Sequence, residues 1–235
     1  MESIIHRAES RGRADYGWLK TRYTFSFASY HDPTRMHFGA LRVLNDDWIE
    51  GGKGFDTHPH DNMEIVTIML TGELNHRDSI GHTEILKSNE IQVMTAGSGI
   101  FHAERNNLPY TPIKLFQVWV FPREKNLEPR YEQKWFDPEK RINAWQTLVS
   151  PQDEQALMIN QDAWVSRASL QKEKQLLYEL HGEKQGVYLF VVDGSVTVNE
   201  QDLNIRDGAG IWDTAEIAVK AKEDSDVLVI EVPFS

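Results

Sequence analysis

Short runs rich in apolar, β-branched and aromatic residues recur along the chain, and turn residues separate them. Clear examples are residues 23–27, 38–44, 64–70 and 115–121. These runs have the length and composition of single strands. Dipeptides such as Thr71-Gly72 mark turns between them. Long helical periodicity is missing, so the pattern predicts an all-β protein, a sandwich or a barrel.

An internal repeat divides the chain. Residues 64–74 resemble residues 186–196, because each segment has an apolar strand, a glycine turn and a second strand. A Gly-x-Gly sequence follows in each half, at 97–99 and at 208–210, and we interpret both as turns. Two β-barrel units in tandem are the simplest explanation.

The segment from about 128 to 153 differs from the rest. It is polar, has few apolar runs and contains Pro129, Pro138 and Pro151. This composition is typical of a connection between domains. We therefore expect an N-terminal domain over residues 1–130, followed by a linker and a C-terminal domain over residues 131–235.

Two pairs of potential metal ligands lie in the first half. In His58-Pro59-His60 the imidazoles are two residues apart, and alternate residues of a strand point to the same face. His102-Ala103-Glu104 repeats this spacing with a carboxylate. Three nitrogen ligands and one oxygen ligand could thus converge inside a barrel and bind a borderline divalent ion, such as Fe(II), Ni(II), Cu(II), Mn(II) or Zn(II). An octahedral ion would keep two positions open for substrate or O₂.

The second half lacks these ligands. When Gly194 is laid on Gly72, Leu180 and Gly182 fall on the positions of His58 and His60. We therefore expect one metal site, in the N-terminal domain, and a C-terminal domain without metal ligands.

Composition narrows the classes of function. Asp and Glu number 36 against 25 Lys and Arg, a net charge of −11, which argues against direct nucleic-acid binding. The chain has no cysteine, which excludes disulfides, iron–sulfur clusters and thiol chemistry. A signal peptide is not evident, and no apolar run approaches the roughly 20 residues of a membrane helix. We expect a cytoplasmic protein without membrane contact.

The ligand pairs lie in two blocks, 52–64 and 92–106, that resemble the two cupin motifs in their pirin form. Other segments also resemble pirin, so that the likeness covers nearly the whole chain: 17–19, 24–30, 41–47, 129–133 and 211–213. The resemblance is closest to short bacterial pirin-like proteins described as quercetin 2,3-dioxygenases. Two departures from the general cupin pattern, Asn89 for a Gly-Asp turn and Gly97 for proline, touch no ligand position.

The resemblance implies a bicupin, two tandem jelly-roll-like β-barrels with one metal site. Its ligands map to His58, His60, His102 and Glu104, and Glu64 is not among them. Fe(II) is our first choice of metal, with Ni, Cu, Mn, Co and Zn as alternatives.

The implied reaction is O₂-dependent cleavage of a flavonol such as quercetin, with release of CO, by a monomeric enzyme. Glu104 is the candidate base for the substrate hydroxyl. Two alternatives stay open. One is a non-enzymatic regulator that binds a protein partner according to the metal's redox state, and the other is isomerase or related cupin chemistry on another enol or sugar acid.

The remaining polar and aromatic candidates have plainer interpretations. We expect His76 and His82 to be solvated loop residues, and Glu64 to orient a ligand histidine. The others are expected to be structural or surface residues, with the tryptophans as core or interface anchors: His31, His37, His181, Trp18, Trp119 and Trp212.

Overall fold

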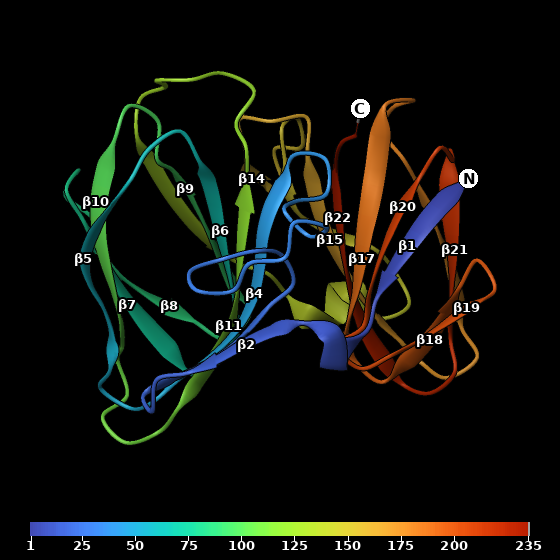
Figure 1. Ribbon diagram of the computed structural model, residues 1–235, viewed down its shortest axis with the longest axis horizontal. Coiled ribbons are helices and arrows are strands. Elements are labelled where there is room, and N and C mark those ends of the chain that lie inside the picture. The colour runs from blue at the N-terminus through green and yellow to red at the C-terminus, as the bar shows by residue number, and fades with distance from the viewer. Residues whose placement is uncertain (235) are drawn as a thin grey trace.

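The computed structural model describes residues 1–234, and its regular structure is almost entirely β (Figure 1). These described residues form 22 strands and two short 3₁₀ helices, η1 (Ala8–Ser10) and η2 (Pro138–Arg141). All strand pairs are antiparallel except β13 with β14. The expected all-β fold is therefore confirmed. Within residues 1–234, no helix is long and apolar enough to cross a membrane.

The N-terminal half contains a seven-stranded and a four-stranded sheet. The larger sheet has the order β12 (Arg130–Trp135), β9 (Glu90–Thr95), β6 (Glu64–Thr71), β11 (Ile113–Val120), β4 (Leu41–Ile49), β3 (Leu19–Tyr23) and β2 (Gly12–Asp15). The smaller sheet has the order β5 (Gly54–His60), β10 (Ile100–Asn106), β7 (Glu73–Asp78) and β8 (Thr83–Lys87).

The C-terminal half repeats this arrangement. Its larger sheet has the order β1 (Glu2–His6), β20 (Gly208–Trp212), β17 (Gln185–Asp193), β22 (Ser225–Pro233), β15 (Trp164–Leu170), β13 (Gln146–Ser150) and β14 (Leu157–Met158). Its smaller sheet has the order β16 (Gln175–Glu179), β21 (Glu216–Ala221), β18 (Ser195–Val198) and β19 (Gln201–Asn204). The internal repeat of the sequence thus corresponds to two similar β units.

The sheets do not follow the division predicted at residue 130. Strand β1 crosses to the C-terminal half and pairs with β20, from Glu2 opposite Trp212 to His6 opposite Gly208 (Figure 1). Strand β12 continues past residue 130 and pairs with β9 of the N-terminal half. The two-domain boundary stays a prediction, with these two strands as exceptions to it.

Two local predictions were wrong, those for the run 23–27 and for the glycines at 208 and 210. The run 23–27 lies mostly outside β3. The segment 128–153 contains strands β12 and β13 as well as η2, and its role as a connection stays a prediction. The glycines at 208 and 210 lie within strand β20, whereas Gly97 and Gly99 form a turn with positive φ. A Cβ at Gly208 would lie 2.5 Å from the Tyr188 hydroxyl oxygen, so close packing requires this glycine.

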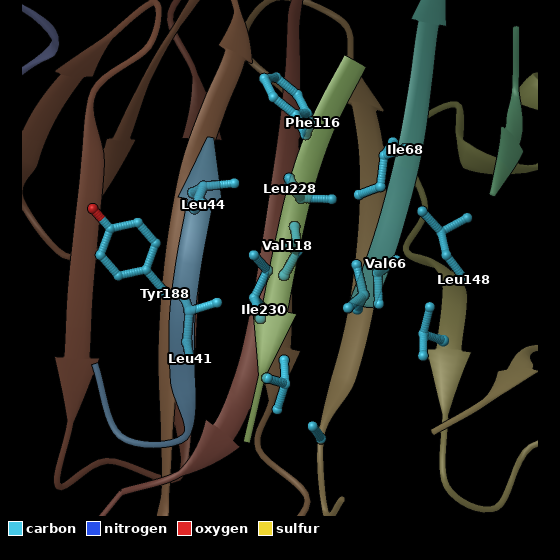
Figure 2. Packing of buried hydrophobic residues seen from close by; sticks show 14 of the residues in the cluster. Leu41, Leu44, Val66, Ile68, Phe116, Val118, Leu148, Tyr188, Leu228 and Ile230 are labelled. Atoms are coloured by element: carbon cyan, nitrogen blue, oxygen red, sulfur yellow. The ribbon is translucent and has the colours of Figure 1, made fainter. Parts of the chain in front are cut away.

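The two large sheets face each other across a common hydrophobic core (Figure 2). Fully buried side chains from the N-terminal half, such as Leu44 and Val118, share this cluster with Leu228 and Ile230 of the C-terminal half. Burying such a side chain contributes about 1.5–3 kcal/mol. The shared core therefore fixes the two halves against each other.

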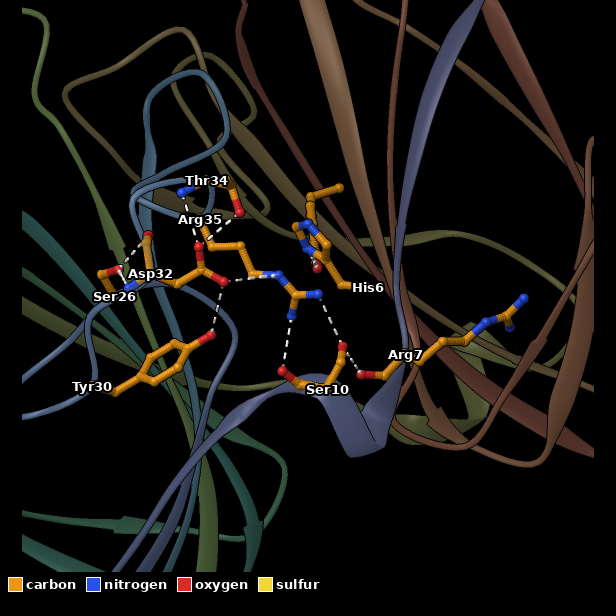
Figure 3. A network of polar contacts seen from close by, with 9 residues as sticks. His6, Arg7, Ser10, Ser26, Tyr30, Asp32, Thr34 and Arg35 are labelled. Carbon is orange, nitrogen blue, oxygen red and sulfur yellow. Dashed lines mark hydrogen bonds and ion pairs between the residues drawn. The ribbon is translucent and has the colours of Figure 1, made fainter.

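A polar network connects the N-terminal segment to the loop before β4 (Figure 3). The Arg35 guanidinium donates to the backbone oxygen and hydroxyl of Ser10, over 3.1 and 3.0 Å. Its Nε also lies 3.8 Å from Asp32, whose other carboxylate oxygen accepts from Thr34. The chain is thus held where it passes from β1 in one half to β2 in the other.

Candidate metal centre

Strands β5 and β10 pair side by side and bring three imidazoles together. His58 lies opposite His102 in the register, and His60 shares the face of His58. The ring centroids are 4.4 Å apart for His58 and His102, and 4.9 Å apart for each pair that includes His60. One nitrogen from each ring can lie within 4.8 Å of the others, a group that could hold a metal ion. The predicted convergence of these residues is therefore present.

The protonation of these rings suits metal ligands. The Nδ1 of His58 lies 2.7 Å from the backbone oxygen of Asp56, which can only accept, so Nδ1 carries the proton and Nε2 is free to ligate. Burial, reinforced by His58, lowers the pKa of His60 to about 4. Burial and the neighbouring His58 and His60 lower the pKa of His102 to about 2.

His102 provides the test of whether a metal fits. Its side chain is buried, and neither ring nitrogen has a hydrogen-bond partner among the described residues. Unpaired buried polar atoms are costly, and a metal ion would satisfy a nitrogen lone pair. The donor set and its unpaired atoms therefore fit a divalent transition metal.

Glu104 is buried beside this group. Burial raises the pKa of its carboxyl to about 7, against hydrogen bonds from Gln117 and with a further increase from Asp47. The Gln117 side-chain amide also donates to the Thr67 hydroxyl over 3.1 Å. The carboxylate of Glu104 does not join the group of His58 and His60 within 4.8 Å, but groups with His102 and His76. That all four predicted ligands bind one ion thus stays a prediction.

A bulge explains the direction of the Glu104 side chain. The pairing of β10 with β5 shifts between His102 and Glu104, because Glu104 lies opposite Phe55 while His102 lies opposite His58. Such a shift bends the strand and redirects side chains. Simple alternation along β10 therefore predicted the burial of Glu104 but not its exact neighbours.

A cavity of about 230 Å³ opens onto these residues. It is lined by the predicted ligands, three further polar residues and three aromatic rings: His58, His60, His102, Glu104, Asn45, Asp47, Gln117, Phe27, Phe55 and Trp119. Trp119 packs edge-on against His60, with ring centroids 4.9 Å apart. The lining of the cavity therefore combines aromatic rings with potential metal ligands.

Gln117 and Asp47 are cavity residues that the sequence analysis missed. Burial raises the pKa of Asp47 to about 7. Gln117 interrupts the apolar run 115–121 and is buried. A polar residue within an apolar strand was the sequence feature that could have identified it as a cavity residue.

The expectation for His76 was wrong. It lies on strand β7 opposite Glu104 of β10, and its side chain is fully buried. Its Nε2 lies 3.1 Å from Asp78, and its ring stacks on Tyr131 with centroids 4.5 Å apart. His82 bonds to the same carboxylate at 3.1 Å but is partly exposed. The sequence feature that could have indicated a strand here is the alternation of Leu74, His76 and Asp78, which places them on one strand face.

Glu64 does not orient a ligand histidine. It is fully buried and accepts hydrogen bonds from the Thr95 hydroxyl, over 3.0 Å, and from the backbone and side chain of Asn160, over 3.2 and 3.3 Å. Asn160 belongs to the segment between β14 and β15. Glu64 therefore joins the two halves of the molecule.

Of the remaining candidates, Trp119 lines the cavity, and the histidines lie outside its lining. His37 is exposed, and its Nδ1 lies 2.9 Å from the Gly39 oxygen. His181 stacks on Trp164, and its Nδ1 lies 2.7 Å from buried Glu231. The tryptophans have separate places: Trp18 packs on Phe55, Trp212 on Phe38 and Phe234, and only Trp119 lines the cavity.

Comparison with known proteins gives matches along nearly the whole chain. The family model described as Pirin matches residues 5–120, and the model described as Quercetinase C-terminal cupin domain matches residues 147–232. A protein named quercetin 2,3-dioxygenase from Escherichia coli O157:H7 is 42% identical over 230 residues, covering 97% of this chain and 98% of the relative. A pirin-like protein of Caulobacter vibrioides is 43% identical over 222 residues, covering 94% and 95%.

The solved structures agree with these matches. The bacterial pirin YhhW of Escherichia coli, solved in complex with nickel(II), superposes with a TM-score of 0.94 at 40% identity, and the match covers 100% of both chains. The two-cupin fold expected from the sequence is confirmed by this match and by the two family models.

Proposed function

The chain belongs to the pirin family, and from this membership and the cavity we propose that it is a metal-dependent dioxygenase that cleaves a flavonol such as quercetin with O₂. The observation that carries the proposal is a cluster of three imidazoles in the lining of a cavity that aromatic rings also line. Relatives that bear the name quercetin 2,3-dioxygenase support this substrate class.

We assign one divalent ion to His58, His60, His102 and Glu104. Imidazole nitrogens with one carboxylate suit Fe(II) and Ni(II) equally, and nickel is present in the related pirin structure. When bound, such an ion stabilises the ionised form of a coordinating hydroxyl group.

The protein side chains bind and deprotonate the substrate. Phe27, Phe55 and Trp119 offer aromatic surfaces to a flat polyphenol and exclude water from it. Glu104 accepts the proton of the substrate hydroxyl, since its carboxylate lines the cavity together with the ligand histidines. The amide of Gln117 holds this carboxylate in place.

The test uses protein loaded separately with Fe(II) and with Ni(II). Quercetin is added, and O₂ consumption, CO release and loss of the flavonol absorbance are followed. We expect turnover with the wild type, and a loss of about 100-fold or more in His60→Ala, because a ligand is removed. His37→Ala is the matched control, an exposed histidine outside the cavity.

Two results would decide against this function. One is the absence of O₂ uptake in metal-replete protein, and the other is equal turnover in the wild type and His60→Ala. In the first case, pull-downs with Fe(II)- and Fe(III)-loaded protein would examine the alternative, a regulator whose protein partner depends on the metal's redox state.

A further inference from the structure

The buried histidine on β7 has a free nitrogen beside the metal centre. His76 is fully buried, and its Nδ1 has no hydrogen-bond partner among residues 1–234. Its ring centroid is 5.3 Å from that of His102. One donor atom each from His76, His102 and Glu104 can lie within 4.8 Å of the others. All three residues are at most 4% exposed. They therefore form a second, buried set of converging donor atoms.

The partners of His76 determine which nitrogen is free. The Asp78 carboxylate accepts hydrogen bonds from the backbone N–H groups of Ile80 and His82, and it lies 3.1 Å from a ring nitrogen of His76 and of His82. An ionised carboxylate only accepts, so the proton of His76 is on Nε2 and the lone pair is on Nδ1. A carboxylate behind a histidine is the usual support of a metal-ligating imidazole, because it fixes the tautomer and raises basicity.

The surroundings hold this ring in one orientation. Tyr131 stacks on it at an interplanar angle of 27°, and the backbone pairing of β7 with β10 places His76 directly opposite Glu104. A bound cation would also offset the burial of the Glu104 carboxylate, for which Gln117 is the only side chain within residues 1–234 that donates a hydrogen bond.

We propose that His76, His102 and Glu104 form an inner position for a divalent transition-metal ion, distinct from the outer position assigned above to His58, His60, His102 and Glu104. The inner position binds an ion without help from the outer histidines. It rests on the metal-binding part of the proposed function through the shared residues His102 and Glu104, and it adds His76 as a ligand with Asp78 as its support.

The experiment removes the outer position first. The double variant His58→Gln/His60→Gln keeps the complete inner group. Its binding of Co(II) is measured by equilibrium dialysis with metal analysis and by visible absorption, which reports coordination directly. We expect about one equivalent of Co(II) to bind. Adding His76→Gln should weaken this binding by at least about tenfold.

His82→Gln in the same background is the matched control. His82 bonds to the same Asp78 carboxylate and stacks on the same Tyr131, but it is partly exposed and belongs to neither ligand group. This variant should bind Co(II) within about threefold of its parent. Circular dichroism and thermal unfolding of each variant verify that it is folded.

Three outcomes overturn the inner position. The double variant binds no Co(II), or the added His76→Gln leaves its affinity unchanged, or His82→Gln weakens binding as much as His76→Gln. If the triple variant does not fold, anomalous scattering from crystals of the Co(II)-loaded double variant decides. A peak within ligand distance of His76 Nδ1 supports the proposal, and its absence there contradicts it. Failure of the proposed function is separate, because it is measured as quercetin turnover by the wild type.

Discussion

The side-chain amide of Gln117 donates to both carboxylate oxygens of Glu104, over 3.3 and 3.1 Å. These hydrogen bonds favour the ionised carboxyl, which burial opposes. Gln117→Leu should therefore raise the pKa of Glu104 further and weaken Ni(II) binding at pH 7 by about 10–100-fold, the usual cost of losing a partner of a ligand. Isothermal titration with a competing chelator measures this affinity.

Gln175→Leu, at an exposed position of β16, is the control and should bind Ni(II) as the wild type does. Equal affinity in both variants would show that Gln117 does not tune the ligand.

Glu64 gives a prediction about the contact between the halves. Glu64→Gln would place an amide donor among groups that already donate to it, from Asn160 and Thr95. We expect a loss of about 1–3 kcal/mol in the free energy of unfolding, measured with urea, and an unchanged Ni(II) affinity. The exposed Glu183→Gln serves as control. If Glu64→Gln instead reduced the Ni(II) affinity and left the stability unchanged, Glu64 would have a role at the metal centre.

Gly210 tests the packing of the two halves. A Cβ there would lie 2.5 Å from Cε2 and 2.7 Å from Cδ2 of the Phe38 ring. Gly210→Ala should cost about 1–3 kcal/mol of stability, because the interface has no room to relax. At Gly182 the nearest atom to a new Cβ is 3.5 Å away, so Gly182→Ala should change stability by less than about 0.5 kcal/mol. Equal urea midpoints for the two variants would show that the interface accommodates the added methyl group without loss of stability.

His6 makes stability depend on pH. Burial, with Arg35 acting in the same direction, lowers its pKa from 6.5 to about 4 in the folded protein. Between these values the unfolded chain binds more protons, so stability is full above pH 6.5 and falls as the pH drops toward 4. The total loss is about 3 kcal/mol.

The measurement is urea unfolding of metal-free protein between pH 4 and pH 8. His6→Gln should have a flatter profile than the wild type, and the exposed His31→Gln should keep the wild-type profile. Parallel curves for the wild type and His6→Gln would contradict the assignment.

The sequence predicts the structure most accurately where the local pattern of residues decides it. The apolar runs at 64–70 and 115–121 became β6 and β11, and the His-x-His spacing placed two imidazoles on one face. The alternation of Leu74, His76 and Asp78 indicates a strand with these residues on one face. Only the pairing of β7 with β10 shows that His76 is buried beside Glu104, and this pairing cannot be predicted from one strand. The glycines of β20 were wrongly predicted to form a turn. Glycine is required there because Tyr188 and Phe38, which are distant in sequence, pack closely against the backbone.

The pairing of β1 with β20 also has a consequence for biosynthesis. Ile4 lies opposite Gly210, so β1 leaves the ribosome long before the strand with which it pairs has been made. This edge of the C-terminal sheet can therefore be closed only after β20 has emerged, however early the N-terminal barrel folds. Until then an unpaired strand is attached to a growing chain, and this interval is when chaperone protection would matter most.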